Sequence, residues 1–504
     1  MPAHGGMPWG WSSARGRILS GGWLGALTYA IPPDLADEAV GDGLAWEMRL
    51  RSLPARLTLY FTLGLCLFGA SPYREVIRQV TAGLGERLAA AGWLAPATTS
   101  LSAGRARLGE APLRSLFRAL RSPLTAGASP WSHVCGLLAV AVDGTTLAVR
   151  DTPANRAALG PPPGTADVPR LRLAALVAVG ARALLDAAAG PAWGPGSGEQ
   201  SLAESLLGSL RAGMLVLADR NFYSWKLWNA AAGTGAGLLW RVTASLRLRF
   251  LAELPDGSWL AHIDDPAAVQ ARNRRNGMRR RRGSRLPPDA GPLPGITVRV
   301  IEYHLTVTAD DGTTRTERYR HVTNLLDWAA YPARDLAAAY ALRWAAETAY
   351  AECKAYLAGS GRPLRSGTPA LARQELWALL SVYQAVRALI ARAAAGAGTD
   401  PGRCSFTAAL HAARRTMASP RHRLTAALGQ AEAEILAAVV PARPGRVYPR
   451  AVKQPTARYP SRAHAKTPIS QHATYTTAIT TPAPPTRTSH SQDKQPQPAL
   501  NQAP

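Results

Sequence analysis

The chain has 504 residues, with 58 Lys and Arg against 33 Asp and Glu, and therefore a formal net charge of +25 at pH 7. Its length allows two or three domains with a sizeable core. The four cysteines are widely spaced, which excludes a small scaffold held by disulfides or by a zinc site. A charge of this size favours polyanionic partners, either nucleic acid or anionic lipid, and says nothing about the fold.

The first 125 residues have the pattern of a helical region. Residues 57–70 form the longest apolar stretch, which is shorter than the ~18 residues that a membrane span needs, so they predict a buried helix. No small-residue cleavage site follows the apolar N-terminal segment, so a secretory signal is not expected. The protein is therefore predicted to stay in the cytoplasm.

Two short helices are predicted over residues 98–109 and 110–120, with a tight glycine-containing turn between them. Arg105 and Arg107 lie on the first of these helices. The pair could form a DNA reader of the helix-turn-helix type, or it could cap the core with a solvated arginine face. The residues alone leave both interpretations open.

Strands and helices alternate between residues 135 and 245, which predicts an α/β domain with a mixed sheet. Asp143 and Asp219 each come at the end of an apolar strand. Asp-Gly is a common hairpin signal, so Asp143 could simply mark a turn, and Asp219 could be the N-cap of the helix that follows. Alternatively, both carboxylates belong to a catalytic site.

Residues 246–320 interrupt this alternation with short β-like pieces and are predicted to be an insertion. Within them, residues 272–285 contain eight arginines and no acidic residue. Such runs are usually solvated loops, but in an enzyme that acts on DNA the run is expected to grip phosphates. The arginines at its centre are predicted DNA contacts: Arg279, Arg280, Arg281 and Arg282.

A long helix is predicted near residues 332–357, with four polar residues on one stripe. Tyr340, Arg343, Glu347 and Lys354 fall within an arc of about 60° at 100° per residue. The opposite side is predicted to face the core, through Leu342, Ala345, Ala346, Ala349, Cys353 and Leu357. An ordinary Arg343–Glu347 pair at i, i+4 would be worth only tenths of a kcal/mol. Against that interpretation, Lys354 is one of only two lysines before residue 453 in a chain that otherwise uses arginine.

More helices are predicted up to residue 440, and the composition then changes. The last 64 residues, from Pro441, hold twelve prolines and a single acidic residue. Such a segment cannot bury enough apolar surface to fold, so residues 441–504 are predicted to be a disordered basic tail.

Three separated motifs together resemble a known family. The spacing Y-(2)-R-(3)-E-(6)-K from Tyr340 to Lys354, the run VDGTT around Asp143 and the run ADRNFYSW around Asp219 are similar to the signature of insertion-sequence DDE transposases of the IS-four family. The resemblance covers about residues 15–440 and leaves the Pro-rich tail outside it.

The resemblance implies an α/β fold with an RNase H-like mixed-sheet catalytic core, interrupted by a β-rich insertion. The expected domains are a helical N-terminal DNA-binding domain (1–125), the catalytic core (135–245 and 321–395), the basic β-rich insertion (246–320) and C-terminal helices (396–440). The disordered tail (441–504) follows from composition and lies outside the resemblance.

The resemblance also implies roles for the motif residues. Asp143, Asp219 and Glu347 are expected to be catalytic and to hold two Mg²⁺ ions, with Mn²⁺ as a substitute, because hard cations prefer oxygen ligands. Tyr340 and Arg343, together with Lys354, are expected to contact DNA phosphates. The expected partner is double-stranded DNA, both element ends and target, and the protein is expected to act as a homodimer across paired ends. It is expected in the bacterial cytoplasm, at the nucleoid, with no membrane involved.

The leading hypothesis is a transposase that moves an insertion sequence by cut-and-paste, acting at terminal inverted repeats. Two alternatives stay open. The first is a metal-dependent nuclease without strand transfer, and the second is a decayed element that only binds DNA. A nuclease would cut DNA without joining the cut ends to target DNA, whereas a transposase would join them. A decayed element would be no more active than its Asp219→Ala variant.

Overall fold

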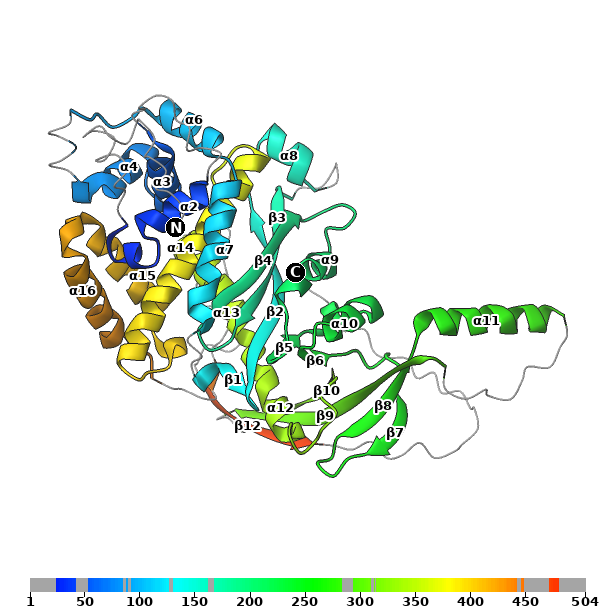
Figure 1. The fold of residues 1–504 in the computed structure, drawn as a ribbon. Coiled ribbons are helices and arrows are strands. Elements are labelled where there is room, and N and C mark those ends of the chain that lie inside the picture. The colour runs from blue at the N-terminus through cyan, green and yellow to red at the C-terminus, as the bar shows by residue number, and fades with distance from the viewer. Residues whose placement is uncertain are drawn as a thin grey trace, which may run out of the picture.

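The computed structural model describes residues 24–41, 53–84, 88, 92–126, 130–161, 167–282, 293–309, 312, 314–441, 446–447 and 471–479. A large mixed sheet forms the middle of the molecule, and most helices gather against one of its faces (Figure 1). The architecture is therefore mixed α/β, as the alternation of strand and helix patterns predicted.

One half of the sheet consists of five strands in the order β4–β3–β2–β5–β6, with β4 at its edge. Their bounds are Leu137–Ala148 for β2, Arg170–Ala178 for β3, Ala183–Pro191 for β4, Met214–Ala218 for β5 and Gly237–Arg241 for β6. Strands β2, β3 and β4 form an antiparallel meander, whereas β5 and β6 run parallel to β2. Parallel neighbours need crossover connections, which α9 (Glu199–Glu204) and α10 (Trp225–Ala232) supply.

Alternate residues of β2 face two different cores, because successive side chains of a strand point to opposite faces. Ala139 and Ala141 join the larger core, together with α13 (Trp344–Ala351) and α14 (Pro369–Gly396). Val140 and Val142 join a second core on the face that α10 covers. Residues 139–142 of β2 are thus buried on both faces, which is why the sequence is apolar up to Asp143.

The segment predicted as an insertion is hydrogen-bonded to this sheet. Its strands are β7 (Arg249–Glu253), β8 (Trp259–Asp264), β9 (Gly295–Ala309) and β10 (Thr314–Thr323). Strand β10 pairs with β6 on one side and with β9 on the other, both antiparallel. Strand β8 pairs with the first part of β9 and with β7. The sheet thus continues from β6 into the strands of residues 246–320.

The arginine run forms most of a helix, α11 (Pro266–Arg281), and not a loop. Asp265 caps the helix by accepting a hydrogen bond from the amide of Ala267, and Pro266 occupies its first turn. None of the helix residues is buried, and Figure 1 shows α11 projecting away from the body. Residues 283–285 of the run lie outside the described part of the chain.

The N-terminal and C-terminal helices pack together beside the sheet. They are η2 (Gly25–Tyr29), α2 (Pro33–Val40), α3 (Ala55–Leu67), α4 (Tyr73–Thr81), η3 (Ala82–Leu84), α6 (Thr98–Leu108), α7 (Ala111–Ala126), α15 (Phe406–Arg415) and α16 (Leu424–Ala437). Helix α3 is buried almost throughout, which confirms the buried helix predicted from the apolar stretch. Shorter elements complete the fold: η4 (Pro130–Ser132), β1 (His133–Val134), α8 (Pro153–Leu159), η5 (Leu207–Ser209), η9 (Pro401–Arg403), η10 (Thr416–Ala418) and η11 (Arg421–Arg423).

Helix α14 runs through the larger core. Among the described helices it is long and apolar enough to cross a membrane by composition, but 78% of its most apolar window is buried inside the protein. Its hydrophobicity is that of a central core helix.

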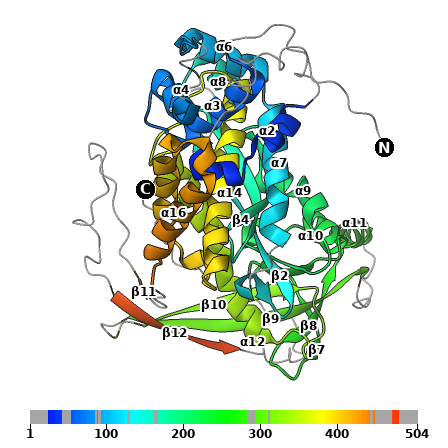
Figure 2. The same cartoon turned by 60° about the vertical axis from the view of Figure 1, so that its left-hand side comes forward.

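The tail differs from its predicted disorder in one segment. Residues Gln471–Ile479 form β12, which pairs antiparallel with the second part of β9, from Ala473 opposite Ala309 to Ile479 opposite Tyr303 (Figure 2). This segment contains no proline, and its Thr and Tyr residues favour a strand. Strand β9 extends beyond β8 and offers a free edge there. A short strand, β11 (Arg446–Val447), pairs with β12, and most of the remaining tail lies outside the described residues.

Candidate active site

Two carboxylates come from neighbouring parallel strands. Val142 of β2 is in register with Ala218 of β5, so Asp143 and Asp219 follow at the same level of the sheet. Asp143 lies within β2 rather than in a hairpin turn. Asp219 precedes a 3-10 turn, η6 (Arg220–Phe222), but its side chain makes no capping hydrogen bond. Neither of the two structural interpretations considered above therefore explains these aspartates.

The third carboxylate comes from the helical segment after β10, which is less regular than predicted. Helix α12 (Ala333–Tyr340) passes into a 3-10 turn, η7 (Ala341–Arg343), then into α13, and then into a π-helical turn, η8 (Glu352–Leu357). These changes in winding rotate the faces. Leu342, predicted to face the core, is 38% exposed, whereas Ala346 and Ala349 are buried as predicted.

Arg343 joins the helical segment to the sheet. Its Nη2 donates to Glu347 Oε1 at 2.9 Å, and its Nη1 lies 3.6 Å from Asp143 Oδ2. The local i, i+4 pair is therefore present, but the same guanidinium also contacts a carboxylate 200 positions away in the sequence. Only 12% of the Arg343 side chain is exposed. Strand β2 and helix α13 thus present two carboxylates to one partly buried cation.

Asp143 is in an environment that opposes its charge. Burial raises its pKa to about 6, and the negative charges of Glu347 and Glu199 act in the same direction. The amide of Gly144, which donates to Asp143 Oδ1 at 2.9 Å, and the Arg343 guanidinium oppose the increase. The carboxylate pair is thus only partly compensated by protein groups.

Glu199, the first residue of α9, is a neighbour that the sequence interpretation missed. Its carboxylate pairs with Arg172 at 3.2 Å. A Cβ built on Gly144 would lie 2.6 Å from Glu199 Cδ, so glycine at 144 leaves the space that this side chain occupies. The only sequence signal was the glycine after Asp143, which also suits a turn.

Tyr340 does not lie on an open surface. It is buried, its hydroxyl donates to Asp219 Oδ1 at 3.4 Å, and its ring centroid lies 4.1 Å from that of His321. Burial raises the pKa of Tyr340 to about 12, so the phenol keeps its proton. In this arrangement the hydroxyl points to a carboxylate, and the phosphate contact of Tyr340 stays a prediction.

His321 of β10 is a second residue that the sequence did not reveal. It is fully buried, and neither ring nitrogen has a hydrogen-bond partner among the described residues. Burial lowers the pKa of His321 to about 3, so the ring is neutral at ordinary pH. It stacks with Tyr303 and Tyr319, and the three rings form a wall behind Tyr340.

Lys354 lies at the other side of the carboxylates. It is exposed, its Nζ donates to Thr145 Oγ1 at 3.1 Å, and desolvation lowers its pKa. A cavity of about 520 Å³ is lined by Asp143, Thr145, Glu347 and Lys354, among others. The structure therefore places the predicted lysine at an open cavity with two of the three predicted carboxylates, Asp143 and Glu347.

Arg105 is not available to DNA, in contrast to the prediction. Its side chain is 1% exposed and donates to Gln374 Oε1 at 3.0 Å, to the Tyr73 hydroxyl at 2.7 Å and to Ser366 Oγ at 3.0 Å. Residues two apart on a helix face different directions, and Arg107 is exposed. Arg105 therefore holds α6 against α14, and only Arg107 can contact a ligand.

The carboxylates offer only oxygen ligands, which suit a hard divalent cation. Asp143 and Glu347 both pair with the Arg343 guanidinium, so their combined negative charge already attracts a cation to this position. Among the residues that the structure describes, no three His, Cys, Asp or Glu side chains are gathered closely enough to hold a metal. The donor chemistry fits a divalent metal ion, and the present arrangement places an arginine between the donors.

Comparison with known proteins gives a consistent result. Residues 22–118 match the family model described as insertion element 4 transposase N-terminal, and residues 135–384 match the transposase DDE domain. The chain is 27% identical over 452 residues to the transposase InsG for insertion sequence element IS4 of Escherichia coli (strain K12), across 86% of this chain and 92% of the relative.

A cryo-EM structure of the piggyBac transposase synaptic complex with hairpin DNA aligns with 84% of this chain and 86% of that chain, at a TM-score of 0.39 and 8% identity. That likeness is too distant to establish a common fold.

Proposed function

This chain belongs to the IS4 family of DDE transposases and is a metal-dependent DNA transposase, which cuts DNA and transfers strands; from this premise we propose that Asp143, Asp219 and Glu347 are its catalytic carboxylates. We further propose that the reaction is cut-and-paste movement of an insertion sequence, at the terminal inverted repeats of the element.

One observation carries the assignment of the carboxylates. The Arg343 guanidinium contacts both Asp143 and Glu347, which are 204 positions apart, while Asp219 follows the neighbouring strand at the level of Asp143. Asp143 and Glu347 therefore meet at an open cavity, and Asp219 follows the strand next to that of Asp143. A purely structural ion pair would not require this cavity.

The family generally uses a divalent metal, and we propose Mg²⁺, as two ions, with Mn²⁺ as a substitute, held by the three carboxylates. When bound, such ions activate a water or a 3′-hydroxyl and stabilise the leaving oxygen of an in-line displacement. The protein itself orients these ligands. The Tyr340 hydroxyl donates to Asp219, and the wall of rings around His321 holds the phenol in place.

DNA binding follows from the family, and the exposed Lys and Arg side chains indicate where the DNA phosphates would lie. Lys354 lies at the rim of the cavity and is placed to bind the phosphate next to the cleaved bond. Arg107 and the arginines of α11 other than Arg272 are exposed and are proposed to bind more distant phosphates. The protruding helix adds reach without disturbing the core, since none of its residues is buried.

Three broader assignments complete the proposal. The order β4–β3–β2–β5–β6, with β2, β5 and β6 parallel, supports an RNase H-like core. The helical region before residue 125 is proposed to be a DNA-binding domain, now through Arg107 and not Arg105. We also propose that the protein acts as a homodimer on paired ends, at the nucleoid in the bacterial cytoplasm.

Strand transfer tests the proposal directly. Cut ends taken from the genomic DNA flanking the gene are incubated with a target plasmid, Mg²⁺ and the full chain, and joined products are quantified. We expect joining by the wild type and a loss of at least about 100-fold in Asp219→Ala, since removing a metal ligand costs more than removing a supporting residue. Circular dichroism should show an unchanged fold.

Asp151→Ala is the matched control, because Asp151 is an exposed aspartate that pairs with Arg156 on the surface. It should join ends like the wild type. Cleavage without joined products would instead indicate a nuclease. A wild type no more active than Asp219→Ala would indicate a decayed element that only binds DNA.

A further inference from the structure

Arg343 is held more firmly than a surface arginine. Its Nη1 and Nη2 face Asp143 and Glu347, and its guanidinium lies 5.9 Å from the ring centroids of both Tyr340 and Trp344. Its Nε is buried without a hydrogen-bond partner among the described residues. The buried Nε is therefore unused, while the two terminal nitrogens face the carboxylates.

No other cation competes for these carboxylates in the described part of the chain. The nearby Lys354 donates to Thr145, and Arg172 pairs with Glu199. Asp143 and Glu347 each form an ion pair with Arg343 and with no other described residue. One positive charge thus faces two negative charges, and it takes up carboxylate oxygens that a metal ion would need.

We propose that Arg343 is the resident counter-cation of the DNA-free active site, and that a DNA backbone phosphate draws its guanidinium off Asp143 and Glu347, so that divalent metal binds more tightly once DNA is bound. This inference rests on the proposed function, since it takes both carboxylates as metal ligands.

The chemistry of arginine suits such an exchange. A guanidinium is planar and always charged, and it pairs with phosphate in the same forked geometry that it uses with carboxylate. Moving from one anion to the other costs it few hydrogen bonds, and the unused Nε can then also donate. A metal ion and Arg343 repel each other at the same oxygens, so the departure of one favours the entry of the other. Metal and DNA must then raise each other's affinity by the same factor.

Binding of Mn²⁺ tests the exchange without relying on catalysis. The free Mn²⁺ signal in electron paramagnetic resonance is followed while the full chain is titrated, with and without duplex DNA from the sequence flanking the gene. Asp143→Asn is titrated in parallel to isolate binding at the carboxylates. We expect the wild type to bind Mn²⁺ weakly alone and about tenfold or more tightly with DNA, within the usual range of coupling between sites.

Arg343→Gln should bind Mn²⁺ without DNA about as tightly as the wild type does with DNA, and added DNA should then change little. Arg373→Gln is the matched control, because Arg373 forms a comparable ion pair with Glu110 elsewhere in the protein. It should behave like the wild type. Thermal unfolding confirms that each variant is folded.

Two results would overturn the inference in distinguishable ways. If Arg343→Gln binds Mn²⁺ no more tightly than the wild type in the absence of DNA, Arg343 is not a counter-cation that metal must displace, while the proposed function stands. If Asp143→Asn leaves Mn²⁺ binding unchanged in every sample, the metal role of Asp143 fails, and the inference fails with it.

Discussion

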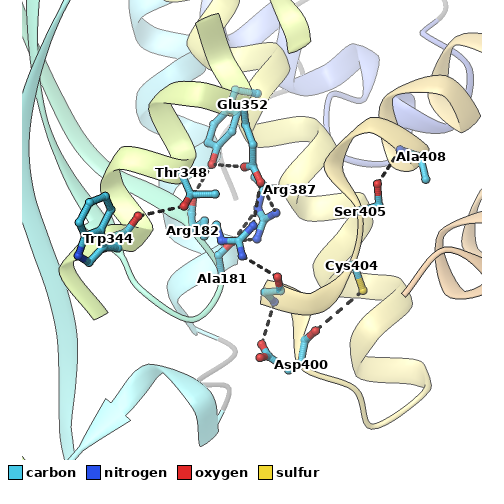
Figure 3. A network of polar contacts seen from close by, with 12 residues as sticks. Ala181, Arg182, Trp344, Thr348, Glu352, Arg387, Asp400, Cys404, Ser405 and Ala408 are labelled. Atoms are coloured by element: carbon cyan, nitrogen blue, oxygen red, sulfur yellow. Dashed lines mark hydrogen bonds and ion pairs between the residues drawn. The ribbon is translucent and has the colours of Figure 1, made fainter. Parts of the chain in front are cut away.

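Glu347 and Glu352 lie five residues apart on the same helical segment, yet their surroundings differ completely. Glu352 is 4% exposed and accepts hydrogen bonds from Arg182 at 2.8 Å and from the Tyr383 hydroxyl at 3.1 Å, with Arg387 3.7 Å away (Figure 3). The Glu347 side chain is 39% exposed and shares a single arginine with Asp143.

The two glutamates therefore have different roles: the cluster around Glu352 is structural, and the cluster around Glu347 is suited to binding a cation. Arg182 also donates to the carbonyl of Gly402 at 2.6 Å, and Arg387 donates to that of Ala181 at 2.7 Å, so the cluster around Glu352 ties the β3–β4 turn to α14 and η9. Its negative charge is fully matched inside the protein. The cluster around Glu347 keeps an excess of negative charge and an open cavity, which is the condition for binding a cation from outside.

The largest difference between the two clusters is expected in stability, when one carboxylate of each is neutralised. Glu352→Gln should lower the free energy of unfolding by about 3–5 kcal/mol, because it leaves buried arginines without their partner. Glu347→Gln should change it by less than about 1 kcal/mol, because that pair is partly exposed. Urea unfolding of the full chain measures both. Equal losses for the two variants would contradict the distinction.

His321 sharpens the comparison, because it is a buried ionisable group whose ring nitrogens have no hydrogen-bond partner among the described residues. Its folded-state pKa of about 3 lies below the ordinary value of 6.5, so the unfolded chain binds the extra proton. The stability that the neutral ring contributes is complete above pH 6.5 and is lost as the pH falls towards 3. At pH 5 the loss should be about 2 kcal/mol.

His321→Phe keeps an aromatic ring and removes the titration. Its unfolding free energy at pH 7.5 should stay near that of the wild type, and its decline between pH 6.5 and 5 should be shallower by that amount. The measurement is urea unfolding at a series of pH values. Parallel curves for the two proteins would show that His321 is not the titrating group.

The smallest expected effect is on DNA binding, and it comes from replacing a solvent-exposed arginine. Arg280 on α11 is exposed, and no residue of the helix is buried, so Arg280→Gln should not affect stability. If it contacts one phosphate, the slope of log K against log salt for duplex DNA should become shallower by about 0.9. Fluorescence anisotropy at several salt concentrations measures the slope.

Arg415→Gln is the control for this substitution, since Arg415 is also exposed but pairs with Glu434. Its slope should equal that of the wild type. An unchanged slope in Arg280→Gln would remove Arg280 from the DNA interface.

Local patterns predicted much of this molecule. The alternation of apolar strands and helices between residues 135 and 245 predicted the mixed sheet, and the apolar run at 57–70 predicted a buried helix. The predictions that failed concern the environment of single side chains. Arg105 and Arg107 look alike in the sequence, but only the first is covered, by Gln374 of α14 and by Ser366 just before that helix.

The helical segment that carries Glu347 shows a further limit. Its spacing predicts a regular stripe, but the 3-10 and π-helical turns rotate Leu342 outwards and Tyr340 inwards. Propensity does not locate such turns, because packing against the sheet imposes them. Strand β12 is similar, since its Thr and Tyr residues permit a strand but the edge of β9 supplies the partner with which it pairs.

The sequence by itself determined the family, the identity of the three candidate carboxylates and the lysine beside them, because residue type and spacing are local properties of the chain. Only the tertiary structure decided which of these charges meet. The parallel pairing of β2 with β5 places Asp143 and Asp219 at one level, and the turn at η7 brings Arg343 between Asp143 and Glu347. Glu199, His321 and the burial of Tyr340 likewise depend on contacts between distant segments, which no local pattern encodes.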